Sequence, residues 1–184
     1  MNLSEITYDL FYQIILEDYG NFSSIKIDPP INVAKVISLP DLGMNEDTQK
    51  SLLKRIIKMR FMLEDYFALK INEEGEITGM PILIENYNPS FHRIYIFLQK
   101  ISDLNWKDEK ECLGGIAKAL AKLYSISKES NTIYAEEESQ WSHIVEYNII
   151  SLLKSGVYIP TAMKEKTFSA LTSLPLLYKV FERC

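Results

Sequence analysis

The residues best suited to metal binding or nucleophilic chemistry are few in this chain, which has two cysteines and two histidines. His92 and His143 lie far apart, and neither has a cysteine or carboxylate at the spacing of a metal site. Cys112 falls within a helical pattern, which predicts a small buried hydrophobe. His143 also falls in an amphipathic pattern, and we interpret it as a polar-face or core residue.

Cys184 is the last residue of the string "LPLLYKVFERC". A thiolate beside a free α-carboxylate would offer two metal ligands. By residue type alone, an end residue without a role is the simpler interpretation, because chain ends are normally frayed and tolerant of change. Both interpretations stay open at this point.

Acidic pairs and glycines suggest no active site within the chain. The sequence has no GxxxxGK[ST] phosphate loop and no GxGxxG turn, and Gly114 and Gly115 lie inside a helical pattern. The pairs Glu64-Asp65 and Glu73-Glu74 fall on a helix and in a turn, where solvation is their expected state. The chain is therefore not expected to be an enzyme.

Composition indicates an ordinary globular protein. The chain has 184 residues, of which 47% are hydrophobic and 24% charged, and this length suits one domain or two small lobes. The net charge of −5 argues against autonomous DNA binding, since the only basic patches are short, such as Lys54-Arg55 with Lys58. No apolar run reaches the roughly 20 residues of a membrane span, and two cysteines suggest a reducing compartment.

The pattern of elements predicts an α+β fold. Helices are expected from Ser4 to about Tyr19, over "NEDTQKSLLKRIIKMRFMLEDYFAL", after Trp106, and from "SQWSHIVEY" to Gly156. "FSSIKI" predicts a strand that ends at Asp28-Pro29-Pro30, outside any central ladder position. "KINEEGEITGM" predicts a hairpin with Gly75 in its turn. "PILIENY" and "RIYIFLQKI" are strand candidates, and "INVAKVISL" is ambiguous between strand and helix.

Four stretches in order carry a family resemblance: "LFYQIILEDYGNF" (10–22), "YFALKINEEGEITGMPILIENYNP" (66–89), "NWKDEKEC" (105–112) and "LYKVFERC" (177–184). Together they closely resemble the C-terminal domain of MutL homologue 1, the common subunit of the eukaryotic mismatch-repair MutL heterodimers. The resemblance runs from about Leu3 to Cys184 and is weak over residues 128–140.

The resemblance implies an α+β domain with a dimerisation lobe and an outer lobe. We expect residues 1–184 to be a fragment of this kind that lacks the ATPase region and the first strands. The implied function is non-catalytic heterodimerisation and partner docking in DNA mismatch repair, with a nuclear location and a link to meiotic recombination. The implied partner is an endonuclease-bearing MutL homologue, and DNA would be reached only through the complex.

The same resemblance gives roles to six residues. Cys184 would be a ligand, in trans, in the partner's metal site, where zinc is the expected ion, and the chain would have no cofactor of its own. Phe181 would anchor the terminal arm, and Glu182 and Arg183 would pair across the interface. Trp106 and Glu109 would dock short motifs of a repair exonuclease and other repair proteins, although Glu109 also suits the first turn of a helix.

Two other hypotheses stay open. A self-contained metal-dependent nuclease or hydrolase would need a His/Cys/carboxylate cluster within the chain, and the two distant histidines argue against it. A diverged remnant that has lost dimerisation would expose an unpaired sheet edge.

Overall fold

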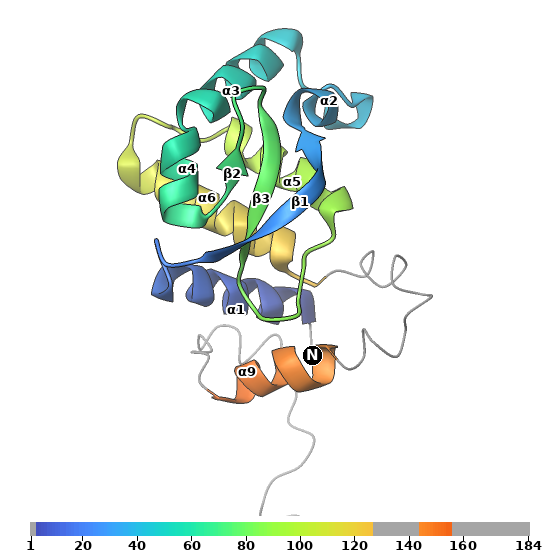
Figure 1. The fold of residues 1–184 in the computed structure, drawn as a ribbon, viewed down its shortest axis with the longest axis vertical. Coiled ribbons are helices and arrows are strands. Elements are labelled where there is room, and N and C mark those ends of the chain that lie inside the picture. The colour runs from blue at the N-terminus through green and yellow to red at the C-terminus, as the bar shows by residue number, and fades with distance from the viewer. Residues whose placement is uncertain (1–2, 127–143, 156–184) are drawn as a thin grey trace, which may run out of the picture.

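The structure is a computed structural model, and it describes residues 3–126 and 144–155. Helices surround one small antiparallel sheet, as expected for an α+β fold (Figure 1). The predicted division into a dimerisation lobe and an outer lobe stays a prediction. None of the helices in these two ranges has the length and apolar content needed to cross a membrane.

The sheet has three strands in the order β1-β3-β2, formed by Ser23–Asn32, Lys70–Ile71 and Glu76–Ile82 in chain order. The predicted hairpin is confirmed, because β2 pairs antiparallel with β3 around a turn that contains Gly75. Gly75 has a φ of +76°, which glycine adopts without a steric penalty. The strand predicted for "PILIENY" is wrong beyond Ile82, where β3 ends.

β1 is longer than the sequence suggested. The strand was expected to end at Asp28-Pro29-Pro30, and it continues two residues further, to Asn32. Its pairing with β3 shifts register between Lys26 and Ile31, so the prolines lie where the ladder is interrupted. β1 is an edge strand of the sheet. This agrees with the expectation for Pro29 and Pro30, because proline has no backbone N–H to donate within a central strand.

The long helix predicted after Asn45 is two helices, α3 (Glu46–Lys58) and α4 (Arg60–Phe67). They meet at Met59, whose backbone leaves helical geometry with φ −97° and ψ 12°. The Asn45 side chain accepts a hydrogen bond from the Thr48 N–H at 2.8 Å and begins α3.

The strand predicted for "RIYIFLQKI" is wrong, because residues Ile94–Ser102 form helix α5. Ile94, Phe97, Leu98 and Ile101 are its buried residues, and their spacing of three and four follows the helical period. The short ambiguous segment is also helical, over Val33–Ile37 (α2). The structure also has two 3₁₀ turns. Pro40–Leu42 lies between α2 and α3, and Phe91–Arg93 directly precedes α5.

Helix α1 (Leu3–Glu17) packs against α6 (Glu109–Tyr124), and α6 packs against α5. In Figure 1, α5 and α6 lie behind the sheet and α1 crosses below its end. α1 begins one residue before the predicted cap, Ser4, and Gly20 follows it with a φ of +78°. Phe11 and Ile15 lie four residues apart on one face of α1, and both are fully buried.

The last described part is a π-helical segment, Ile144–Ile149, that continues into α9 (Ile150–Ser155). This confirms a helix over part of the predicted range. The predicted start near Trp141, His143 and the stop at Gly156 lie outside the described residues.

Candidate peptide-docking site

Trp106 and Glu109 are brought to one place by the connection between α5 and α6. The indole N–H of Trp106 donates a hydrogen bond to the Ile101 carbonyl at 3.0 Å, which fixes the half-buried ring against the end of α5. The Asp108 carboxylate then accepts the Glu111 N–H at 2.8 Å and begins α6. Glu109 is therefore the first residue of α6, and its side chain is exposed.

Both residues line a cavity of about 210 Å³ between α4 and the start of α6. It is smaller than the roughly 300–1,000 Å³ of typical small-molecule sites, and its volume is that of about one large side chain. Its lining is mostly apolar, and we call it the docking groove: Met59, Met62, Tyr66, Trp106, Lys107, Glu109, Cys112 and Leu113.

The chemistry of the docking groove favours an aromatic side chain with a positive charge beside it. Met59 and Met62 offer polarisable, adaptable thioethers that make favourable contacts with rings. Tyr66 is 42% exposed, which is unusual for so large an apolar side chain next to a core helix. Glu109 is the carboxylate that lines the groove, where it can accept hydrogen bonds from a lysine or arginine.

Tyr19 supports the groove from behind Tyr66. The two rings stack with their centroids 5.2 Å apart, and the Tyr19 hydroxyl is buried without a hydrogen-bond partner among the described residues. Burial raises the pKa of Tyr19, and Tyr66 and the Glu109 carboxylate raise it further. The Tyr19 side chain therefore stays neutral beside the acidic end of the groove.

Cys112 forms part of the apolar lining, as the prediction of a small buried hydrophobe required. It is 3% exposed, and burial raises the pKa of its thiol. A neutral buried thiol is a poor metal ligand, so its contribution here is packing. No group of three or more histidine, cysteine or acidic residues that could hold a metal occurs in residues 3–126 and 144–155.

Glu109 lies where the helix-dipole interpretation requires, and its docking role stays a prediction. It lies in the first turn of α6, where a carboxylate interacts favourably with the helix dipole, and it also lines the docking groove. Met59, Met62 and Tyr66 across the groove were not predicted as site residues, because in one continuous helix Met59 and Tyr66 fit the apolar stripe that faces a core. The only available signal was the local excess of large apolar residues on one helix.

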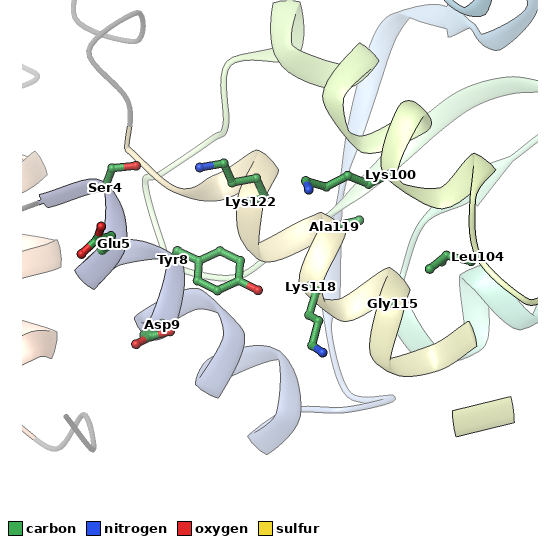
Figure 2. Close-up of a pocket in the computed structure, with 10 residues that line it drawn as sticks. All are labelled: Ser4, Glu5, Tyr8, Asp9, Lys100, Leu104, Gly115, Lys118, Ala119 and Lys122. Atoms are coloured by element: carbon green, nitrogen blue, oxygen red, sulfur yellow. The ribbon is translucent and has the colours of Figure 1, made fainter. Parts of the chain in front are cut away.

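A second cavity, of about 550 Å³, lies between α1 and the pair α5 and α6. Figure 2 shows the ring of Tyr8 extending from α1 toward α6, with Glu5 and Asp9 on the same helix. Lysines on α5 and α6 line the cavity from the other side: Lys100, Lys118 and Lys122. Burial and then the Glu5 charge raise the pKa of Asp9. None of the predicted site residues lies in this cavity.

The predicted terminal arm, with its residues Phe181, Glu182, Arg183 and Cys184, lies outside the described residues. Its roles, including the zinc ligand, stay predictions.

Comparison with known proteins gives three similar chains. This chain is 28% identical to a MutL protein homolog 1 of Schizosaccharomyces pombe and 28% identical to DNA mismatch repair protein MLH1 of Saccharomyces cerevisiae. It is 31% identical to DNA mismatch repair protein Mlh1 of Dictyostelium discoideum. Each alignment covers 100% of this chain but only 28%, 27% and 24% of the three relatives. The chain thus spans about a quarter of the length of the relatives it matches.

The family described as "DNA mismatch repair protein Mlh1 C-terminus" matches residues 1–184. This range includes all four stretches that carried the resemblance, and both the predicted arm and the docking groove fall inside it. The chain therefore belongs to the family of Mlh1 C-terminal regions.

Proposed function

We propose that this chain is a non-catalytic heterodimerisation and partner-docking domain that acts in DNA mismatch repair. Membership of the Mlh1 C-terminal family supports the process, since the relatives it matches are named as DNA mismatch repair proteins. The observation that carries the docking role is the position of the Glu109 carboxylate on the wall of an apolar groove made by methionine and aromatic side chains.

Docking would combine two kinds of contact. An aromatic side chain of the partner would bury apolar area against Met59, Met62 and Tyr66. A neighbouring lysine or arginine would donate charge-assisted hydrogen bonds to Glu109. Partners of this chemistry are repair proteins with a short basic-aromatic motif, among which a repair exonuclease is the expected example.

A peptide-binding experiment tests the docking role. The affinity of a fluorescein-labelled peptide with an arginine next to an aromatic residue would be measured by fluorescence anisotropy for the chain and for two variants. Glu109→Gln should weaken binding about threefold to tenfold, because it removes the charge on the groove wall. Glu111→Gln, which removes the same charge from the same helical turn outside the groove, should leave the affinity unchanged. Equal effects of the two variants would contradict the proposal.

Heterodimerisation would join the chain to a MutL homologue that carries the endonuclease. The Cys184 thiolate would then be a ligand in the partner's metal site, since thiolates bind zinc well. Phe181 would anchor the arm in the interface, and Glu182 and Arg183 would add a rim ion pair of little energy. The chain itself would supply no catalytic group, and its place of action would be the nucleus.

Co-purification and nicking assays separate assembly from the role of Cys184. Cys184→Ser should leave the heterodimer intact by size-exclusion chromatography while reducing its zinc content and its metal-dependent nicking of DNA. Cys112→Ser is the matched control, because it changes the other thiol of the chain. Normal nicking and zinc content in the Cys184→Ser complex would contradict the ligand role, and loss of assembly would assign the residue to dimerisation instead.

A further inference from the structure

Four positive side chains gather next to the docking groove. They line a cavity of about 340 Å³ whose other walls are Ser51, Met59 and Trp106. We call them the basic cluster: Lys54, Arg55 and Lys58 from α3, and Lys107 from the connection before α6.

Helical spacing brings two of these lysines together, and local contacts hold Arg55 in place. Lys54 and Lys58 are four residues apart on α3 and so share a face of the helix. Arg55 lies over the Trp106 ring, with its guanidinium carbon 6.0 Å from the ring centroid, and donates a hydrogen bond to the Ser51 hydroxyl at 3.3 Å. The last turn of α3 also favours positive charge through the helix dipole.

None of the four cluster residues forms an ion pair with a carboxylate within the described part of the chain. The ion pairs in that part involve Lys26, Lys50, Arg60 and Lys70, and none of the four cluster residues. The cluster is a local exception in a chain whose net charge is −5. Four like charges in one cavity repel one another, and a bound anion would relieve this repulsion.

The basic cluster and the docking groove are continuous. Met59, Trp106 and Lys107 line both cavities, so the Trp106 side chain is a wall common to the two. The combined surface therefore carries the Glu109 carboxylate in the docking groove, Lys107 where the two cavities meet, and Lys54, Arg55 and Lys58 in the second cavity. A peptide that fills the groove would bring its next residues onto the cluster, since an extended chain advances about 3.3 Å per residue.

We propose that the basic cluster is an anion subsite of the docking groove, which binds an acidic or phosphorylated side chain a few residues from the partner's basic-aromatic motif. This inference rests on the proposed docking function. It adds that the preferred partners carry an anionic side chain near the basic-aromatic motif. A carboxylate and a phosphate share the required chemistry. Duplex DNA fits less well, because its rows of phosphates would extend beyond the four cations onto the carboxylates of Asp108, Glu109 and Glu111, whereas a single anionic side chain need not.

The test compares three labelled peptides that share the basic-aromatic motif and differ in one flanking position: glutamine, glutamate or phosphoserine. The flanking residue is moved from one to five positions from the motif in separate peptides. For the unmodified chain, fluorescence anisotropy should show at least one spacing at which glutamate or phosphoserine binds about threefold to tenfold more tightly than glutamine. The gain should shrink as salt is raised. A gain with phosphoserine only would identify a phosphorylated partner as the source of the anion.

Lys54→Gln/Lys58→Gln should abolish this gain and leave the affinity for the glutamine peptide unchanged, because neither lysine lines the docking groove. The matched control is Lys100→Gln/Lys118→Gln, which removes two lysine charges at the other cavity (Figure 2) and should keep the gain. Circular dichroism checks that both variants are folded.

Three results would overturn the inference alone, and a fourth would overturn the docking function with it. The first is equal affinity for all three peptides at every spacing while Glu109→Gln still weakens binding, in which case the docking proposal alone survives. The second is loss of the gain in the control variant. The third is a short DNA duplex that displaces the acidic peptides and depends on Lys54 and Lys58. Failure of even the glutamine peptide to bind would contradict the docking function itself, and the inference with it.

Discussion

Gly115 lets the loop that precedes Trp106 pack closely on α6. A Cβ atom at Gly115 would lie 2.3 Å from Leu104 Cδ2, whereas one at the neighbouring Gly114 would meet no heavy atom within 4 Å. Gly114→Ala should raise the free energy of unfolding by about 0.5–1 kcal/mol, as alanine does in an open helix interior. Gly115→Ala should be about 1–3 kcal/mol less stable than Gly114→Ala, because Leu104 must move. Urea unfolding measures both, and equal values would contradict the packing argument.

The sequence predicted Trp106 and Glu109 as site residues through one matching motif, but it could not supply the opposite wall of the groove. Met59 fits the apolar stripe of a continuous helix, and in that setting it is a core residue. The structure ends α3 at Lys58, so that Met59 is only half-buried and faces the groove. A helix break that depends on tertiary packing leaves no glycine or proline in the sequence to mark it.

Arg93 directly precedes α5 and contacts the C-terminal end of α6. Nothing in the sequence predicted this contact. Arg93 is 5% exposed, and its guanidinium donates hydrogen bonds to carbonyls at the end of α6, at 2.6 Å to Ser125 and 3.1 Å to Lys122. A cation at this position satisfies terminal carbonyls and suits the negative end of the helix dipole.

Removal of this contact should be costly. Arg93→Met is expected to lower the free energy of unfolding by about 2–4 kcal/mol, because buried carbonyls lose charged donors. Arg60→Met is the control, since Arg60 pairs with the exposed Glu73 at 3.1 Å and should cost less than about 1 kcal/mol. Chemical denaturation would measure the free energy of unfolding of both variants. A small effect of Arg93→Met would show that water can satisfy the carbonyls that Arg93 contacts.

Helix α5 explains why one element was predicted wrongly. Residues 94–101 are nearly all apolar or aromatic, and such a short run suits a buried strand and a buried helix equally well. Tertiary packing favours the helix over the strand. α5 packs against α6, and Phe97, Leu98 and Ile101 are buried together, which the helical period allows and strand alternation does not. The hairpin, by contrast, was predictable because Gly75 marks its turn locally.

Tyr124 is fully buried in the core of the described residues, where it joins α6 to the sheet. Its hydroxyl donates a hydrogen bond to the Pro81 carbonyl, and its own carbonyl accepts one from Tyr87 at 2.6 Å. Burial raises the pKa of Tyr124 far above the ordinary value of 10.0, and Tyr87 raises it further. The folded state thus holds the phenol proton, whereas the unfolded chain releases it as the pH rises past about 10.

Stability should therefore be complete below about pH 10 and decrease as the pH rises above that value. Tyr124→Phe should cost about 1–2 kcal/mol at neutral pH, because the Pro81 carbonyl loses its donor, and should make the alkaline decrease shallower. Urea unfolding over a pH series measures this, with Tyr95→Phe at an exposed site as the control. An alkaline decrease that is unchanged in Tyr124→Phe would assign the effect to other groups.

The docking groove is a property of the whole molecule, since it forms only where the α3–α4 break meets the start of α6. Binding of the basic-aromatic peptide can be located directly with ¹³C-methyl methionine NMR, because the chain has only six methionines. The account predicts saturable shifts of the Met59 and Met62 methyl signals, assigned by leucine substitution, and no shift of Met44 or Met80. Binding that shifts Met44 or Met80 instead, or that leaves Met59 and Met62 unmoved, would contradict the account.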